Sequence, residues 1–413
     1  MRSWGQCARF DSPVDLQQRA DVHNPQGLLL LLQEFTISRE EVGEDTAVRF
    51  RCERDVLVET LSSASRAVAG RAVAMPVLSG IRLQVAGDTV VVTGTDRDLT
   101  ISTQALVAGG TDGVVVAPGR LVTDIVRALD PGAVVLDADD DELRISSGRS
   151  HFSVRTLPAG EFPRLPVPTG EEVTLPVEGL ADALRQVTRA ASGEEARPIL
   201  TGVLMTAEAG GLRMVATDSY RLAVRDLRGV GVLSEGQKVL VPSRALNELQ
   251  RLLGGSGQQV ALRLGAHEAT FTVGPVSLTT RLIEGEFPNY QQLIPSGYPN
   301  RLVVGREPLL DAVRRVKLLA RDATTPVRIA LRADGIELTV ITTDYGTAAE
   351  EVDAKYDGAE MTVAFNPTYL LEGVEAITGE EVVLDTLDTL KPATLRPIDT
   401  DDYLYLLMPV RVS

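Results

Sequence analysis

The residues best suited to chemistry in this sequence are Asp218 and Arg221, within the segment A-T-D-S-Y-R-L-A. A carboxylate and a guanidinium three residues apart can act as a catalytic dyad. The same spacing also suits a turn that is closed by the aspartate and carries a surface arginine. We favour the turn, because two apolar runs flank the polar residues, as in antiparallel strands joined by a tight connection.

Other catalytic arrangements are not indicated. Of the three histidines, His23 precedes the repeated part of the chain, while His151 and His267 fall in alternating strand patterns, so no Ser-His-Asp or Cys-His arrangement is suggested. The sequence contains no P-loop, no dinucleotide fingerprint and no H-E-x-x-H. The acidic run at 139–142 is typical of a solvated hairpin turn. We therefore expect no catalytic residues, no enzyme activity and no cofactor.

Composition favours a cytoplasmic protein of two or three domains. The chain has 413 residues and a net charge of −16, which argues against a wholly basic surface but permits a basic patch. Its two cysteines, Cys7 and Cys52, provide neither a disulfide framework nor a metal site. The most apolar run, Leu28–Leu32, is too short to span a bilayer, and we expect no membrane association.

Basic residues recur at equivalent helical positions. Arg120 and Arg127 are seven residues apart, as are Arg244 and Arg251, and this spacing puts each pair on one helix face. Any one of these residues alone would be an ordinary solvated side chain. In an acidic chain, their recurrence indicates a segregated positive field. The first helix of each copy of the repeat described below adds further basic residues. They are Arg66, Arg185, Arg189, Arg314, Lys317 and Arg321.

These helices belong to a repeat that begins at Val48. Each copy has an amphipathic helical pattern, a proline-marked turn into a strand, a Thr-Asp landmark and a second helix that starts at a proline. The Thr-Asp aspartates Asp96, Asp218 and Asp344 are 122 and 126 residues apart, and G-E-F-P occurs at 160–163 and 285–288. A period of this length indicates whole α+β domains in triplicate. In the third copy Tyr369, Glu372 and Glu375 replace the basic pattern of the second helix.

The predicted boundaries are 47–170, 171–300 and 301–413. Residues 1–46 match nothing later in the chain. They form a poorly ordered extension, a regulatory tail or a segment ahead of the true start codon, and we favour disorder or an upstream start.

The segments A-T-D-S-Y-R-L-A, G-E-F-P, S-G-R-S-H-F-S-V-R-T-L-P at 147–158 and the M-P-V-R ending resemble the bacterial DNA polymerase III beta subunits, the beta sliding clamps. The resemblance covers about Val48 to the end. It implies a head-to-tail homodimer of three clamp domains per subunit. This closed ring has no catalytic role, encircles duplex DNA and tethers the replicative polymerase. By family position it marks Arg71, Arg120, Arg127, Arg197, Arg244 and Arg251 as DNA-facing, with contacts to phosphate that carry no sequence information.

The resemblance also implies two protein-binding sites. The subunit interface is expected at Arg144, Arg149, Phe152 and Val154 on an end strand of the first copy, facing Leu318, Leu319, Glu350 and Glu351 of the third. A groove for partner peptides with apolar anchors is expected between the second and third domains. Its residues are Leu200, Thr217, Ser219, Tyr220, Arg221, Leu222, Pro288, Leu293, Leu406, Met408 and Pro409.

The expected partners are double-stranded DNA, a second copy of the chain, the replicative polymerase catalytic subunit, the clamp-loader complex and other proteins with a clamp-binding motif. Two alternatives stay open. One is a specialised duplicate clamp, for example an antibiotic-tolerant one. The other is a scaffold that uses only the peptide groove and does not bind DNA.

Overall fold

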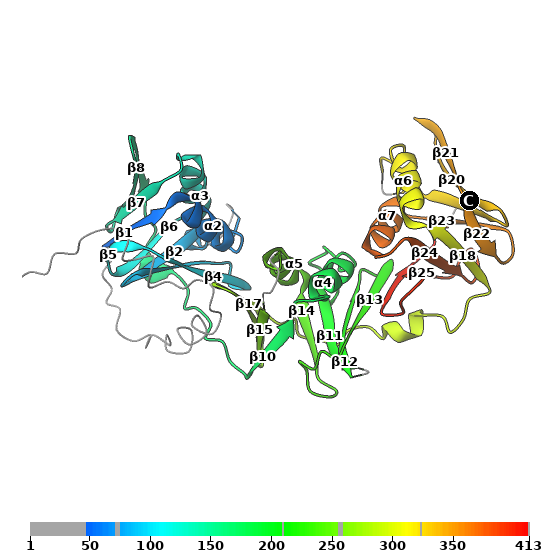
Figure 1. The fold of residues 1–413 in the computed structure, drawn as a ribbon, viewed down its shortest axis with the longest axis horizontal. Coiled ribbons are helices and arrows are strands. Elements are labelled where there is room, and N and C mark those ends of the chain that lie inside the picture. Colours follow the sequence, from blue (N-terminus) through cyan, green and yellow to red (C-terminus); the bar gives the residue numbers. More distant parts are fainter. Residues whose placement is uncertain (1–46, 71–74, 209, 255–258, 323, 412–413) are drawn as a thin grey trace, which may run out of the picture. The chain divides into compact units, whose positions relative to one another are not determined.

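The structure, a computed structural model, describes residues 47–70, 75–208, 210–254, 259–322 and 324–411. In these residues each of the three copies forms an α+β unit with two helices and two antiparallel sheets (Figure 1). The tandem α+β architecture predicted from the sequence is thus confirmed. The predicted extension, residues 1–46, lies outside the described residues.

The first unit carries α2 (Arg54–Ser65) and α3 (Gly119–Ala128). Short 3-10 helices, η1 (Pro76–Ser79) and η2 (Ala159–Glu161), precede β2 and follow β9. The strands are β1 (Val48–Glu53), β2 (Gly80–Ala86), β3 (Thr89–Thr95), β4 (Leu99–Leu106), β5 (Ala108–Thr111), β6 (Gly113–Pro118), β7 (Ala133–Ala138), β8 (Glu142–Ser147) and β9 (Ser150–Arg155).

The second unit carries α4 (Leu180–Thr188), η3 (Pro198–Thr201) and α5 (Ser243–Leu252), and η4 (Tyr290–Leu293) lies in the linker that follows. Its strands are β10 (Glu172–Pro176), β11 (Gly202–Glu208), β12 (Gly211–Thr217), β13 (Arg221–Arg228), β14 (Lys238–Pro242), β15 (Gln259–Leu264), β16 (Glu268–Val273) and β17 (Val276–Arg281).

The third unit carries α6 (Arg306–Lys317) and α7 (Pro367–Ala376). Its strands are β18 (Asn300–Gly305), β19 (Val327–Arg332), β20 (Gly335–Thr342), β21 (Gly346–Val352), β22 (Ala354–Asp357), β23 (Met361–Phe365), β24 (Glu381–Thr386), β25 (Ala393–Pro397) and β26 (Tyr403–Leu407).

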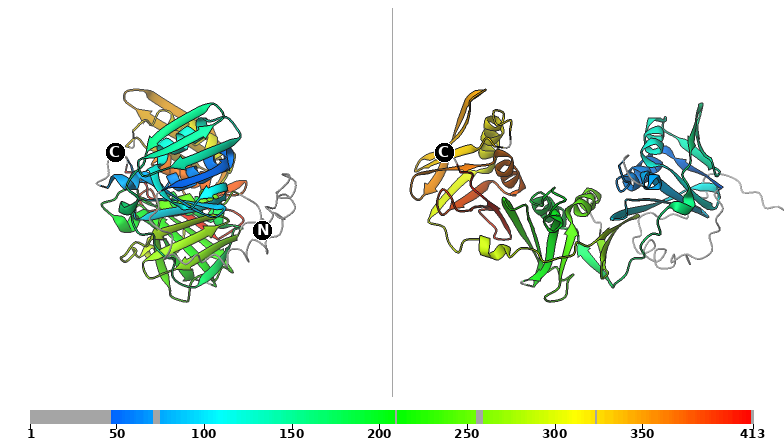
Figure 2. Two further views of the ribbon diagram at one scale, coloured as in Figure 1. Left: turned by 90° about the vertical axis from the view of Figure 1, so that its left-hand side faces the viewer. Right: turned by 180° about the vertical axis from the view of Figure 1, so that it is seen from behind.

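The helices form where apolar residues recur at helical spacing. Leu57, Leu61 and Ala64 of α2 are fully buried, as are the matching residues of α4 and α6, and Figure 2 shows each helix pair against the sheets of its own unit. The expectation that proline opens each second helix is right only for α7. In α3 and α5 the prolines, Pro118 and Pro242, are the capping residues just before the helix.

Two sheets run continuously from one unit into the next. Strand β4 of the first unit pairs with β17 of the second, and β13 of the second pairs with β26 of the third. The resulting sheet orders are β10-β15-β16-β17-β4-β3-β2-β6 and β14-β11-β12-β13-β26-β25-β24-β18-β22. The other two sheets, β5-β1-β7-β8-β9 and β21-β20-β19-β23, belong to single units and end at edge strands β9 and β21.

The G-E-F-P landmarks lie in the linkers between units. Phe162 packs with Val77, Leu78 and Val116 on the sheet face away from the helices. Phe287 packs in the same way against a cluster that contains Leu240. The repeated landmark therefore supplies an aromatic residue that fastens each linker to a sheet.

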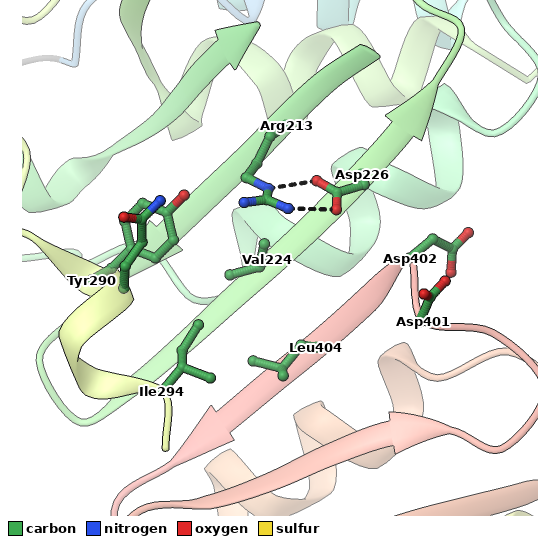
Figure 3. A pocket seen from close by; sticks show the side chains of 9 residues that line it. Arg213, Val224, Asp226, Tyr290, Ile294, Asp401, Asp402 and Leu404 are labelled. Atoms are coloured by element: carbon green, nitrogen blue, oxygen red, sulfur yellow. Dashed lines mark hydrogen bonds and ion pairs between the residues drawn. The ribbon is translucent and has the colours of Figure 1, made fainter. Parts of the chain in front are cut away.

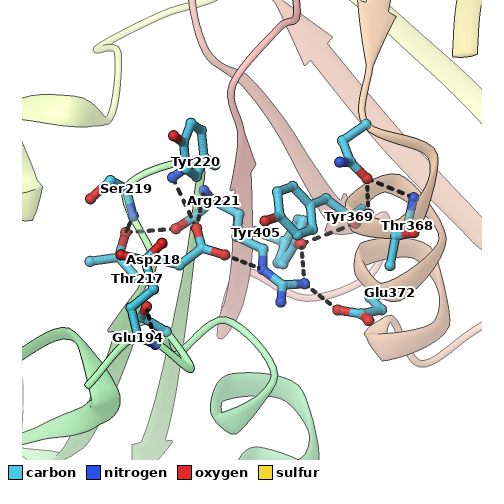
Figure 4. A network of polar contacts seen from close by, with 12 residues as sticks. Glu194, Thr217, Asp218, Ser219, Tyr220, Arg221, Thr368, Tyr369, Glu372 and Tyr405 are labelled. Atoms are coloured by element: carbon cyan, nitrogen blue, oxygen red, sulfur yellow. Dashed lines mark hydrogen bonds and ion pairs between the residues drawn. The ribbon is translucent and has the colours of Figure 1, made fainter. Parts of the chain in front are cut away.

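A polar network joins the second and third units (Figure 4). The Asp218 carboxylate accepts hydrogen bonds from the backbone N–H groups of Tyr220 (2.9 Å) and Arg221 (3.0 Å), which confirms the predicted turn. The predicted surface arginine is wrong, because Arg221 is only 8% exposed. Its guanidinium donates to Asp218 Oδ2 at 3.0 Å, forms an ion pair with Glu372 and lies 4.3 Å from the Tyr369 ring centroid.

The partners of Arg221 in this network keep its guanidinium protonated. Burial alone lowers the pKa of Arg221, but Tyr405 and Glu372 raise it by more, so the guanidinium stays protonated. Burial raises the pKa of Tyr405, whose neutral hydroxyl donates to the Tyr369 carbonyl at 3.0 Å. Arg221 thus ties a turn of one unit to a helix of the next.

No helix in the described part of the chain is long and apolar enough to cross a membrane.

We expect Arg221→Met to lower the free energy of unfolding by about 3 kcal/mol, because it leaves the buried Asp218 carboxylate without its cation. Arg228→Met is the matched control, since both partners of the Arg228–Asp401 pair are mostly exposed, and its cost should stay below about 0.5 kcal/mol. Urea unfolding followed by circular dichroism measures both variants. Equal midpoints for the two variants would contradict the structural role of Arg221.

Candidate functional site

Three of the predicted basic residues meet one acidic residue at the second junction. Arg189 and Arg314 donate to the two carboxylate oxygens of Glu375, each at 3.1 Å, and Arg185 donates to the Glu375 backbone carbonyl at 3.1 Å. Burial raises the pKa of Glu375, but the hydrogen bonds from Arg314 and Arg189 outweigh it, and the pKa lies below its usual value. Glu375 of α7 therefore faces basic residues of α4 and α6 and the basic residue that caps α4.

The first junction repeats this arrangement with other residues. Arg66, the residue that caps the C-terminus of α2, lies 2.8 Å from Glu248 Oε2 of α5, and Arg251 donates to the other oxygen of that carboxylate. Arg244 forms an ion pair with Asp96, in the turn between β3 and β4. Many of the arginines thus stabilise the contacts between units.

The remaining cations are distributed as follows. Arg127 pairs with Asp124, and Arg197 pairs with Glu194. Arg120 and Lys317 have no carboxylate within 4.0 Å in the described part of the chain, and Arg71 lies outside it. The assignment of these basic residues to a DNA-facing surface stays a prediction. They are Arg66, Arg71, Arg120, Arg127, Arg185, Arg189, Arg197, Arg244, Arg251, Arg314 and Lys317.

The residues predicted for a subunit interface lie in the first and third units. Phe152 and Val154 are on edge strand β9, whereas Arg144 is on β8 and Arg149 is in the β8–β9 turn, so they do not share one strand as predicted. Glu350 and Glu351 are on edge strand β21. Leu318 and Leu319 follow the last residue of α6 and are not within the helix. Leu318 is 73% exposed and Phe152 is 40% exposed.

The predicted groove residues surround an apolar cluster where β13 meets β26. Leu222 and Leu406 are directly opposite each other across the two strands, and Val224 is opposite Leu404. All four side chains lie on the sheet face away from the helices and pack with Tyr290 of the linker. The floor of the groove is therefore a run of paired aliphatic side chains.

The equivalent face of the first junction is polar. There Thr100 is opposite Thr279 and Ser102 is opposite Ser277, at the strand positions that correspond to the four groove residues. The same backbone arrangement thus carries hydroxyl groups at one junction and aliphatic side chains at the other. This contrast limits an apolar floor to the junction of the second and third units.

Exposed residues form the rim. Tyr220 is 58% exposed, Leu293 46% and Met408 36%, and the Met408 backbone N–H donates to the Tyr220 carbonyl at 2.9 Å. Ser219 and Pro288 are also exposed, Pro409 is half-buried, and Leu200 and Thr217 are buried. The guanidinium of Arg221 lies on the opposite, helix-facing side of the sheet, where it contacts Tyr405 of the core.

A cavity of about 330 Å³ continues the groove along the same sheet face (Figure 3). Val224, Leu404 and Ile294 form its apolar part, and Arg213 spans its polar part by donating to both oxygens of Asp226, at 2.6 and 2.8 Å. Hydrogen bonding to Asp226 raises the pKa of Arg213.

Sequence reasoning missed Val224, Leu404, Tyr290 and Ile294. Strand alternation carried a signal for two of them, since Val224 and Leu404 are two residues from predicted groove residues and share their face.

In the described part of the chain, no group of three His, Cys, Asp or Glu side chains is arranged to hold a metal ion. His267 was predicted in a strand, but it lies in the turn between β15 and β16 and pairs with Glu284 at 3.2 Å. Residues 139–141 of the acidic run form the predicted hairpin turn between β7 and β8, and Glu142 is the first residue of β8.

Three family models match consecutive parts of the chain. They describe the N-terminal, central and C-terminal domains of the DNA polymerase III beta subunit and cover residues 48–166, 174–289 and 291–411. A beta sliding clamp of Staphylococcus aureus is 31% identical over 377 residues, which are 88% of this chain and 99% of that protein.

Solved structures give the same result. A sliding clamp of Bartonella birtlesii bound to griselimycin has a TM-score of 0.82 and 31% identity, with 89% of this chain and 100% of that chain covered. The DNA polymerase sliding clamp of Bacillus subtilis has a TM-score of 0.81 and 28% identity at the same coverage. With its three domains matched in order, the chain belongs to the family of bacterial DNA polymerase III beta subunits.

Proposed function

We propose that this chain is a DNA sliding clamp. Two copies pair head to tail into a closed ring around duplex DNA, and the ring tethers the replicative polymerase and other partners through the groove at the β13–β26 junction. The observation that carries the proposal is the repeated strand pairing between units. It leaves two complementary edge strands, β9 in the first unit and β21 in the third.

The strand correspondence supports ring closure. Strands β17 and β26 are each the last strand of a β-meander, and each pairs with the strand that follows the Thr-Asp turn of the preceding unit. In the first unit, β9 is the last strand of the meander and so corresponds to β17 and β26. In the third unit, β21 follows the turn at Asp344 and so corresponds to β4 and β13. Both are free edges, which are prone to pair with another chain. Pairing β21 with β9 of a second copy repeats the internal junctions and is a heterologous contact that can close.

Charge and apolar surface at these edges suit such a contact. Glu351 on β21 is acidic, as is Glu350, which already pairs with Arg315. Arg149 beside β9 is basic, as is Arg144, which already pairs with Asp139. The exposed side chains of Leu318 and Phe152 supply apolar area next to them.

The basic residues suit a weak, sequence-independent hold on DNA. Many of them are already paired with carboxylates, so each offers only part of its charge to a phosphate. A ring that holds DNA by enclosure needs no stronger contact, and weak contacts favour sliding. Loading onto DNA requires an opened ring, which is consistent with a clamp-loader complex as a partner.

Retention on DNA tests the proposal. We expect the protein, loaded by a cognate clamp loader on nicked circular DNA, to co-migrate with the circle in moderate salt and to be lost when the circle is cut. Gel filtration of a labelled protein before and after linearisation measures this. A scaffold that does not enclose DNA would give the same result on circular and linear molecules.

Groove binding is tested with Leu293→Asp and Met408→Asp. Both side chains are exposed on the rim, whereas a charge at the fully buried Leu222 would disturb the sheet itself. We expect each variant to weaken binding of a fluorescent peptide carrying the polymerase's clamp-binding motif by about tenfold or more, because the peptide's apolar anchors lose their contacts.

Leu106→Asp is the matched control, since Leu106 is an exposed leucine at the end of β4, in the first unit, and is not part of the β13–β26 junction. Its peptide affinity should equal that of the parent protein. Unchanged affinity in both rim variants would contradict the groove assignment without affecting the test of DNA retention.

A further inference from the structure

The two internal junctions share a contact besides strand pairing. In each, the turn before the junction strand of one unit touches the first turn of the second helix of the next unit. At the first junction Asp96 of the turn pairs with Arg244, the second residue of α5. At the second junction Tyr220, the residue just before β13, stacks on Tyr369, the third residue of α7, with ring centroids 6.5 Å apart.

The third and first units carry exposed residues that suit a third contact of this kind. Tyr345 immediately precedes β21, as Tyr220 precedes β13, and it is 59% exposed. Leu121 is the third residue of α3 and is 50% exposed. It lies next to Arg120, the residue that corresponds to Arg244 and Tyr369 when each helix is counted from its proline. Neither exposure is explained by the folded subunit, since a large apolar side chain gains by burial.

We infer that Tyr345 of one subunit packs on Leu121 of its partner, and that an aromatic–aliphatic contact in this dimer replaces the ion pair of the first internal junction. The inference rests on the proposed head-to-tail dimer and names the partner as a second copy of this chain. Arg321 holds Tyr345 in place from its own subunit, with the guanidinium carbon 4.7 Å from the ring centroid.

The residue that caps the first helix of each unit also changes from charged to apolar in the third unit. The residue that caps the C-terminus of the first helix is Arg66 in α2 and Arg189 in α4, and each arginine pairs with a glutamate of the next unit. In α6 the capping residue is Leu318, which is 73% exposed. Ile341, near Tyr345 at the end of β20, is 52% exposed. At this helix-capping position the third unit therefore has an apolar residue where both internal junctions have an arginine in an ion pair.

A double-mutant cycle tests the contact. Leu121→Ala, Tyr345→Ala and the double variant are made in the full chain, and the dimer dissociation constant is measured by sedimentation equilibrium. We expect each single variant to weaken the dimer by about tenfold or more. The double variant should be little weaker than the single ones, because the second truncation removes a contact that is already lost.

Leu390→Ala controls for the loss of an exposed leucine, and thermal melting checks that each variant folds. Additive effects in the double variant, or single variants as tight as the Leu390→Ala control, would overturn the inference while the parent dimer stands. A parent protein that sediments as a monomer would instead overturn the proposed ring.

Discussion

The pairing of one edge strand with the next determines the organisation of this protein. An edge strand with unpaired backbone N–H and C=O groups tends to pair with another strand. Within the chain this pairing occurs twice, between β4 and β17 and between β13 and β26. Because the same pair of strands is used each time, three units in tandem always leave one edge of each kind, β9 and β21. The proposed dimer would therefore pair two edges of the same kinds as those that pair at the internal junctions.

A repeated junction then becomes specialised through its side chains alone. On the face away from the helices, Thr100 and Ser102 correspond to Leu222 and Val224, and this change converts a polar face into an apolar floor. On the helix side, the ion pair of Arg244 with Asp96 corresponds to the stack of Tyr220 on Tyr369. Backbone geometry sets where units meet, and side-chain chemistry sets what else each meeting point can bind.

The sequence was sufficient to predict the units but not the contacts between them. Helical spacing, prolines and the Thr-Asp turns are local signals, so they located the helices, the hairpin at Asp218 and the threefold repeat. Arg221 shows the limit of this reasoning. Its spacing from Asp218 predicts a turn, but nothing local indicates that Glu372, 151 residues later, comes to the same place and buries it. His267 was misplaced for a different reason, since a polar residue in a short turn continues the alternation of the strands around it.

The arginines illustrate the same limit and lead to a physical consequence. Recurrence on helix faces indicated a positive field, yet Arg66, Arg189 and Arg244 each have a carboxylate partner at a junction. Each of these ion pairs stabilises a junction between units. A DNA phosphate that approached one of these arginines would have to compete with the carboxylate for the guanidinium. In the proposed ring, attraction to DNA would then come from charges that are already partly neutralised. A protein that must stay on DNA while moving along it gains from this, since enclosure supplies retention and strong individual phosphate contacts would only add barriers to sliding.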